Sequence, residues 1–471
     1  MGGKLLVRCY NVGCGDCIYV RIPNGDDHFH ILIDCGSKEG ANTGVMARAI
    51  KHLADNELPP VEGSDKKRLD LIVVTHRHED HIKGFDRKFF KKIALGNIWI
   101  TAAMDKSHPQ AQRSLALHGF VSTAMNDLAD SGAALSPELT DLVALYGIGN
   151  KGATTALTKD LPEDNHIEPA YVFAGKTSDD FGISIEDTKI IVLAPEQDID
   201  GFYLGKEADE SLRGVQDGAG HFRGLSGPAE AAAPTNISGS DFRTLQSRLL
   251  SNGLAFAVDD SKIQNNVSTV LLIEWGKRRL LFVGDAAWEE EFEEGKKNGS
   301  WNVMWQKRKA HLSKPVDFLK AGHHGSHNAT PWNRHADKDQ EVNQILDAIL
   351  PLPKAGKKPT AKCLVSTKRK QYDTIPDGEL LAEIGKRVSN TRNYLKDFKK
   401  ENPEFDPDEE VFNYSVLKTY SKEPTPRQVG DKGWLDQPQP IRTDMESAGK
   451  GQEKMLGEVE FIDVEIDSDD G

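Results

Sequence analysis

Long hydrophobic runs are absent from this chain of 471 residues, and cysteine is scarce. No apolar stretch approaches the roughly 18 residues that a membrane-spanning helix requires. The first residues lack the apolar core of a signal peptide and lead directly into a strand-like pattern. The chain has five cysteines, an odd number that argues for a reducing compartment rather than a disulfide framework. We therefore expect a cytoplasmic protein with no membrane partner.

Positive charge is also in short supply. The chain has 59 Lys and Arg residues against 73 Asp and Glu residues, a formal net charge of −14. This balance argues against binding to long duplexes, because neutralising phosphates requires Lys and Arg. Local basic clusters occur at 88–92, 307–309 and 368–370, and acidic residues gather after Gly451. The charge does not exclude binding to single strands, strand ends or small nucleotides.

The most informative stretch, residues 70–81, is a short apolar run that ends in three histidines and two carboxylates. The apolar part reads as a buried strand, followed by a loop at its carboxyl end. His76 and His78 are two positions apart, so both imidazoles fall on the same side of an extended backbone. Asp80 and His81 follow the turn and can serve a second ion. Because histidine and aspartate suit zinc, manganese or iron, the stretch predicts a metal site.

Three strands are expected before this loop, at 5–9, 17–22 and 30–34. Asp34 ends the last one, where a buried carboxylate is costly unless a hydrogen bond or a cation satisfies it. We interpret Asp34 as a residue that orients a ligand or the metal loop. A turn-capping aspartate is the alternative.

Four of the cysteines lie in the same region. Cys14 and Cys17 form a Cys-x-x-Cys pair, with Cys9 and Cys35 nearby. One such pair without a second is a weak indication of a zinc or redox motif. These cysteines are therefore interpreted as small buried residues.

The second half of the chain supplies two more strand ends with polar residues. A strand at 279–283 ends in Gly284 and Asp285, and another near 316–321 leads into His323 and His324. An asparagine turn at 265–268 precedes a further strand.

Taken in order, these motifs resemble the metallo-β-lactamase superfamily, and more closely the hydrolase domain of ComEC-type DNA-uptake proteins and their free-standing relatives. The matching strings are the turn at 11–16, the strand end at 32–36, the His-x-His-x-Asp-His loop at 76–81, Asn-Asn-x-Ser at 265–268, Gly-Asp at 284–285 and His-His-Gly-Ser at 323–326. Cys14 stands where the usual turn has glutamine. The resemblance implies an α/β fold, a four-layer αββα sandwich with a helical insertion and a C-terminal extension.

Domain boundaries follow from where the resemblance ends. We expect a hydrolase domain over 1–375, with insertions at about 107–165 and 205–240. A helical and charged extension over 376–471 should follow, with an acidic tail of disorder-prone composition. The helical insertion and the acidic tail are candidate surfaces for a protein partner.

The resemblance also implies a site for two divalent ions, manganese or zinc. His76 and His78 should hold one ion and Asp80 and His81 the other, with Asp285 between them. Either His323 or His324 completes the second ion. The candidate catalytic residues are Asp80, Asp285, His324, Ser326 and His327. The candidates for supporting the ligands from behind are Asp34, Asn266 and Ser268.

Two departures from the family pattern affect this expectation. No histidine occurs between His221 and His311, where many superfamily members supply another ligand to the first ion. An open, oxygen-richer site favours manganese over a closed zinc site. The Tyr-Gly-His-Pro string of ComEC relatives is replaced by a string without histidine at 371–376, so Lys368, Lys370 or nothing takes that role.

The expected function is hydrolysis by a dinuclear metal site. Two ions about 3.5–4 Å apart hold a bridging hydroxide, so no Ser or Cys nucleophile is needed. The resemblance implies a phosphodiesterase or nuclease acting on DNA, RNA or nucleotides. Hydrolysis of a carboxyl ester, lactone or thioester is the second hypothesis. The third is a partner-regulated subunit of a multi-protein system, such as a defence system.

Overall fold

The computed structural model describes residues 3–39, 44–130, 137–146, 148–205, 254–289, 291–337, 340–368, 375–394, 396, 400, 437–446 and 459–468. The expected insertion at 205–240 lies almost wholly outside these residues, as do Lys370 and much of the acidic tail. Within the described ranges, no helix is both long and apolar enough to cross a membrane.

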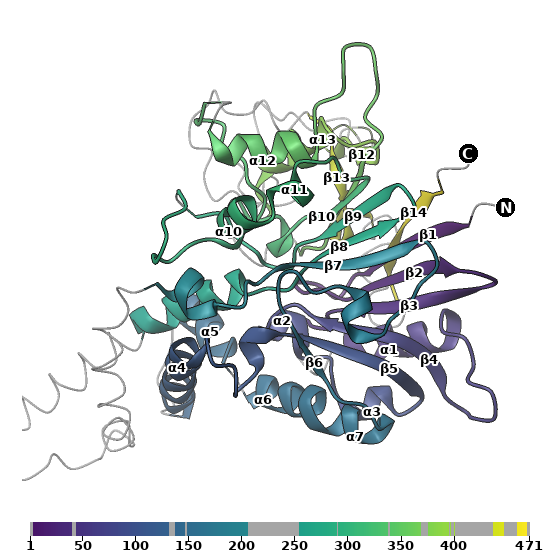
Figure 1. Ribbon diagram of the computed structural model, residues 1–471, viewed down its shortest axis with the longest axis vertical. Coiled ribbons are helices and arrows are strands. Elements are labelled where there is room, and N and C mark those ends of the chain that lie inside the picture. Colours follow the sequence, from purple (N-terminus) through teal and green to yellow (C-terminus); the bar gives the residue numbers. More distant parts are fainter. Residues whose placement is uncertain are drawn as a thin grey trace, which may run out of the picture.

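Two sheets, each of seven strands among the described residues, form the centre of the protein (Figure 1). The first has the order β14-β1-β2-β3-β4-β5-β6. Its strands are β1 (Lys4–Tyr10), β2 (Ile18–Asn24), β3 (Asp27–Ile33), β4 (Lys67–Val74), β5 (Ile93–Thr101), β6 (Ala170–Val172) and β14 (Phe461–Asp467). β1, β2 and β3 form an antiparallel meander, whereas β3 to β6 pair in parallel. The three strands expected before the metal loop are confirmed.

The second sheet has the order β12-β13-β11-β10-β9-β8-β7. Its strands are β7 (Thr188–Ala194), β8 (Val270–Trp275), β9 (Arg278–Phe282), β10 (Phe318–Lys320), β11 (Lys362–Val365), β12 (Thr391–Arg392) and β13 (Gln439–Arg442). β9, β10, β11 and β13 run parallel to one another. The strands expected at 279–283 and near 316–321 are confirmed, although β10 is shorter than expected.

The two sheets pack face to face, and helices cover their outer faces (Figure 1). Alternation in β4 shows the arrangement. Leu71 and Val73 point into the core between the sheets, whereas Ile72 and Val74 pack on the outer side, where Ile50 of α1 contributes to the same cluster. The helices of that outer layer are α1 (Val45–Asn56), α3 (Arg87–Phe90), α6 (Ile148–Thr155) and α7 (Leu161–Asn165). Leu71 and Val73 are fully buried, as a strand with helices on one side and a sheet on the other requires.

The second sheet has a matching outer layer, so the expected four-layer αββα sandwich is confirmed. Its helices are α10 (Ser300–Lys307), α11 (Lys309–Leu312), α12 (Glu341–Ile349) and α13 (Gly378–Gly385). Ile345 and Leu381 from these helices pack with Leu281 and Leu319 from the sheet.

The helices expected at 107–165 pack in two different places. α6, the π-helical turn η3 (Ala156–Asp160) and α7 complete the outer layer of the first sheet, through Ala153, Leu157 and Leu161. α4 (Gln112–Asp130) and α5 (Pro137–Ala144) lie at the side of the sandwich (Figure 1). Around α4 a separate small core forms, in which Val121 packs with Ile263 from the helical residues 254–266.

The described residues beyond 375 contribute strands to both sheets. β12 and β13 continue the second sheet, and β14 pairs with β1 at the edge of the first, which brings the two termini together (Figure 1). Of the helical extension expected from residue 376 onwards, the described residues contain α13 and helical residues at 394, 396 and 400, with β12 between them.

The acidic tail contains a strand that its charge conceals. Val464 and Ile466 of β14 alternate with carboxylates and are buried against the sheet. Asp463 pairs with Arg8, and Glu465 pairs with Lys4. Two carboxylates of this part of the tail are therefore paired with basic residues of β1, which the net charge of the segment did not reveal.

The parallel arrangement gathers polar residues at one edge. β3 and β4 of the first sheet, and β9, β10 and β11 of the second, all deliver their carboxyl ends to the same side of the sandwich. The residues that follow these strands are the ones singled out by the motifs. This is where open α/β sheets bring functional side chains together.

Candidate metal centre

The loop after β4 supplies four buried side chains. His76 leaves the strand, and His78, with an extended backbone, precedes the short helix α2 (Glu79–Ile82). Asp80 and His81 lie in this helical turn rather than in an open loop. All four are at most 4% exposed, which is unusual for charged or polar side chains unless they bind something.

Asp285 enters from the opposite sheet, after β9. Gly284 before it has a φ of 52°, and a Cβ atom there would lie 3.0 Å from the Cβ of Thr75. Only glycine accommodates both the left-handed backbone and this close approach. The Gly-Asp pair therefore lets the second sheet place a carboxylate directly against the metal loop.

Strained backbone marks the same place. Of the five non-glycine residues with positive φ in the described chain, Asp34, His323 and His324 belong to this site, with φ values of 56°, 41° and 56°. Such conformations cost free energy and persist where the surroundings enforce them, often at functional sites.

One group of ligand atoms joins His76, His78 and Asp285. His76 Nε2 lies 3.0 Å from His78 Nδ1 and 3.6 Å from Asp285 Oδ2. His323 Nε2 approaches the same carboxylate oxygen, at 3.7 Å. The structure thus places His323 beside the group that contains His76 and Asp285.

A second group lies on the other side of Asp285. His81 Nε2 is 3.2 Å from Asp285 Oδ1, and His324 Nε2 is 3.3 Å from Asp80 Oδ2. His324 Nδ1 faces the carbonyl oxygen of Ser366 at 3.1 Å and must donate to it. In the neutral ring, Nε2 is then the unprotonated nitrogen that a metal needs. The structure therefore separates His323 and His324, which their spacing could not.

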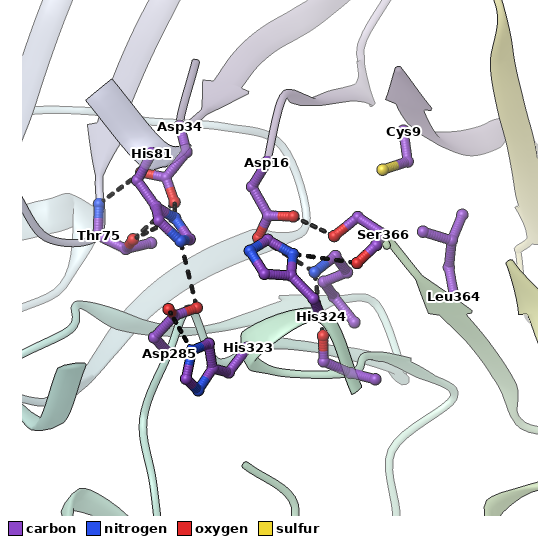
Figure 2. Close-up of polar contacts among 12 residues, drawn as sticks. Cys9, Asp16, Asp34, Thr75, His81, Asp285, His323, His324, Leu364 and Ser366 are labelled. Atoms are coloured by element: carbon purple, nitrogen blue, oxygen red, sulfur yellow. Dashed lines mark hydrogen bonds and ion pairs between the residues drawn. The ribbon is translucent and has the colours of Figure 1, made fainter. Parts of the chain in front are cut away.

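The carboxylate of Asp34 anchors this arrangement from behind (Figure 2). It accepts hydrogen bonds from the backbone N–H of Thr75 at 2.7 Å and from Thr75 Oγ1 at 2.6 Å. His81 Nδ1 lies 2.7 Å away and donates to it, which directs His81 Nε2 towards Asp285. Figure 2 shows His81 between the two carboxylates. This is the usual way in which a carboxylate fixes the orientation of a metal-binding histidine.

The other two supporting candidates play unequal parts. Ser268 Oγ accepts from the backbone N–H of Asp285 at 3.1 Å and lies 3.3 Å from His76 Nδ1, so it touches the site. Asn266 Oδ1 instead accepts from the backbone of Ala287 and Ser300. Asn266 therefore shapes the loop after Asp285.

Burial and charge act against each other in the protonation of this cluster. Burial would lower the pKa of His81, but Asp285 and Asp34 hold it well above its usual value. Burial would raise the pKa of Asp285, but the surrounding imidazoles, that of His81 most strongly, hold it well below. Burial lowers the pKa of His76 far below normal and that of His78 to about 4. Metal ions bind neutral imidazoles and ionised carboxylates, so His76, His78 and Asp285 already have the binding form, whereas an ion at His81 must displace a proton from the ring.

Unpartnered ligand atoms test whether the cluster fits metal ions. Five buried atoms of this cluster make no hydrogen bond: His78 Nε2, Asp80 Oδ1, His81 Nε2, Asp285 Oδ1 and His323 Nδ1. Of these, His81 Nε2 and Asp285 Oδ1 form an ion pair with each other, and the other three have no such contact. Leaving buried polar atoms unsatisfied costs about 1–3 kcal/mol each. Their concentration at one spot, on residue types that bind divalent cations, fits a metal centre.

Sequence reasoning missed several side chains of this site. Asp16, from the turn after β1, bonds to Ser366 (Figure 2). Asp16 also lies 3.1 Å from Lys320 Nζ, and both members of that ion pair are about 2% exposed. Lys38 Nζ lies 3.4 Å from Asp80 Oδ2. A lysine within the apolar strand β10 was a readable signal for the first pair. No local pattern marked Lys38.

Ser326 and His327 turn elsewhere. Ser326 Oγ donates to Asn328 Oδ1 at 3.0 Å, as in an ordinary polar turn. The side chain of His327 is 63% exposed, and its Nδ1 lies 3.6 Å from Asp377 Oδ2. Lys368 pairs with Glu39, whereas Lys370 lies outside the described residues.

Comparison with known proteins supports part of the expected identity. The family model of the metallo-beta-lactamase superfamily matches residues 11–93, which include the turn at 11–16, Asp34 and the metal loop. A search of curated proteins finds no match. The fold, the family match and the groups of buried ligand atoms together support a metal-dependent hydrolase. The closer resemblance to ComEC-type proteins stays a prediction.

Proposed function

We propose that this chain is a phosphodiesterase or nuclease that acts on DNA, RNA or nucleotides with two divalent ions. His76, His78 and Asp285 would hold the first ion, with His323 beside them. Asp80, His81 and His324 would hold the second, with Asp285 between the two. When bound, such a pair of ions lowers the pKa of water and draws charge from a phosphoryl oxygen.

The residues around the ligands hold them in place for this chemistry. Asp34 keeps the proton of His81 on Nδ1, so that Nε2 remains available as a ligand. The Ser366 carbonyl does the same for His324. Ser268 holds the backbone of Asp285. A preorganised set of ligands loses little orientational freedom when substrate binds.

The observation that carries the phosphodiester proposal is the position of Lys38. Its ammonium lies 3.4 Å from Asp80, and its side chain is 18% exposed, so a positive charge stands beside the ligand groups and reaches solvent. A phosphate oxygen carries the negative charge that this ammonium attracts. A neutral ester offers no such charge. The acidic net charge of −14 supports short or single-stranded substrates over long duplexes.

The test compares substrates on protein reconstituted with manganese or zinc. We expect metal-dependent cleavage of bis(p-nitrophenyl) phosphate and of at least one of single-stranded DNA, duplex DNA or RNA, with no cleavage of p-nitrophenyl acetate. Asp80→Ala and Asp285→Ala should abolish it. Lys38→Ala should raise KM for the phosphodiester, whereas Lys38→Arg should retain most of the affinity. Cleavage of the acetate ester alone would replace this proposal with the carboxyl-ester hypothesis.

The cellular setting is part of the same proposal. All five cysteines are free and buried, which supports a reducing compartment such as the cytoplasm. We propose nucleic acid or nucleotide as the partner, and leave a protein partner to the outcome in which the metal-loaded chain cleaves nothing alone.

A further inference from the structure

The turn that carries Cys14 is clamped against the metal loop. A Cβ atom on Gly15 would lie 2.3 Å from the carbonyl oxygen of Gly36, and one on Gly36 would lie 2.2 Å from the backbone of Asp80 and His81. Three layers of backbone are therefore stacked with no side chain between them. Only glycine permits this approach.

Hydrogen bonds fix the same stack. The backbone N–H of Asp16 donates to the carbonyl of Asp80 at 2.9 Å, and that of Gly36 donates to the carbonyl of Asp16 at 2.9 Å. The N–H of Lys38 donates to the carbonyl of Cys14 at 2.8 Å. The position of Cys14 relative to Asp80 is thus set by backbone contacts rather than by a flexible side chain.

This clamp brings a thiol to the second group of ligand atoms. Cys14 is 1% exposed, and its sulfur lies with ligand atoms of Asp80 and His324, all within 4.8 Å of one another. His324 and Lys38 contact Asp80 Oδ2, whereas Asp80 Oδ1 is buried and has no hydrogen-bond partner. A thiol, an imidazole and a carboxylate with one unsatisfied oxygen thus meet in one group.

We propose that Cys14 is a ligand of the second ion, beside Asp80 and His324, and that it makes this position selective for zinc over manganese. The inference rests on the proposed metal centre and names one further ligand of it. A thiolate is a soft ligand that zinc accepts readily, whereas manganese prefers oxygen and imidazole. When zinc binds, the sulfur–metal bond forms and the thiol proton leaves to solvent. This preference for zinc differs from the preference for manganese that the sequence suggested through the absence of a histidine between His221 and His311.

The remaining cysteines have other contacts. Cys17 and Cys35 interact with each other. The thiols of Cys9 and Cys363 face backbone carbonyls, at 3.9 and 4.0 Å. Among the described residues, Cys14 is the cysteine that joins a candidate metal group. Cys363 is therefore a matched control, because it is equally buried and lies outside the ligand groups.

The experiment substitutes cobalt for the native metal in the full chain. We expect a sulfur-to-cobalt charge-transfer band in the near ultraviolet from the wild type and from Cys363→Ser. The band should be lost in Cys14→Ser, and the affinity of the second site for zinc should fall by at least about tenfold. Manganese affinity should change little, so the preference for zinc over manganese should shrink by the same factor.

A measurement on unmodified protein covers the case in which Cys14→Ser does not fold. X-ray absorption of the zinc-loaded wild type should show one sulfur neighbour for every two zinc ions, at about 2.3 Å. Two ions bound with only nitrogen and oxygen neighbours would overturn the role of Cys14 and leave the metal centre intact. Failure to bind any metal would overturn both proposals.

Discussion

Two clusters of buried carboxylate and imidazole groups in this protein look alike in composition but differ in how they are satisfied. Around Asp260, in the helical region beside α4, Oδ1 accepts from Gln264 at 2.9 Å, and Oδ2 accepts from His118 at 2.8 Å and Tyr146 at 2.9 Å. Around Asp285, five potential ligand atoms have no hydrogen-bond partner, and two of them, His81 Nε2 and Asp285 Oδ1, contact only each other as an ion pair at 3.2 Å.

The difference shows what each cluster is built for. The carboxylate of Asp260 has protein donors at both oxygens and stabilises the packing of the helices around it, although Gln264 Oε1 beside it has no hydrogen-bond partner. A cluster with unsatisfied atoms is stable only when something else supplies the missing interactions. The residue types alone do not distinguish a structural cluster from a candidate metal centre, because both contain carboxylates and imidazoles. The hydrogen-bond partners of each buried atom distinguish them.

The largest effect should come from removing the carboxylate shared by both metal groups. Asp285→Asn should lower metal affinity by more than about 100-fold, because a change behind a ligand already costs 10–100-fold. For the wild type, metal at 100 times its Kd should add about 2.7 kcal/mol to the free energy of unfolding. That gain should be absent from the variant. Calorimetry with and without metal measures it, and an unchanged gain would refute the assignment of Asp285.

Removing the carboxylate of Asp260 should lower the stability of the fold and leave metal binding unchanged. Asp260→Ala leaves the donors of His118 and Gln264 without their acceptor, whereas Tyr146 keeps the carbonyl of Ala257. The free energy of unfolding should therefore fall by about 3 kcal/mol. Bound metal per folded chain should stay the same. Urea unfolding and metal analysis of the folded fraction check both points. Loss of metal from folded Asp260→Ala would mean that this cluster supports the metal loop, which Arg77 connects to it electrostatically.

The candidate ligands that sequence reasoning could identify lie on short motifs at strand ends. His76 to His81 are contiguous, and the Gly-Asp pair ending in Asp285 announces a close approach of backbone. The spacing of His323 and His324 could not assign each to its group of ligand atoms. Both residues have positive φ, and this tight turn directs their rings to different groups. Ser326 and His327 were expected at the site but are engaged by Asn328 and Asp377.

What escaped prediction depends on contacts between distant parts of the chain. Cys14 reaches His324 only because glycines let three backbone segments stack. Asp16 meets Lys320 across the two sheets. In β14, carboxylates masked the alternation of Val464 and Ile466, so a paired strand resembled a disordered tail.

An intermediate effect is expected from Asp34, which has a satisfied carboxylate in contact with the unsatisfied cluster. Asp34→Asn weakens its bond to His81 Nδ1, so metal affinity should fall by about 10–100-fold while binding remains measurable. Asp70→Asn is the control, since Asp70 also accepts a backbone N–H, that of His30, but lies on β4 away from the ligands. Equal losses in the two variants would show a general weakening of the sheet.

The smallest effect concerns pH and separates the two clusters without a metal ion. Burial, and then the charge of Arg77, lower the pKa of His118 despite its contact with Asp260. A histidine with a lowered pKa in the folded state stabilises the protein above its unfolded pKa of about 6.5, and this contribution is lost as the pH falls towards the folded value. His118→Asn keeps a side-chain N–H for Asp260 but does not titrate.

In chelator-treated protein, the free energy of unfolding of His118→Asn should therefore fall less than that of the wild type between about pH 7 and 5. The histidines of the metal cluster are common to both proteins, so their titration cancels in the difference. Parallel slopes would mean that His118 does not titrate differently in the folded and unfolded states, and the cluster around Asp260 would then stabilise the fold independently of pH in this range.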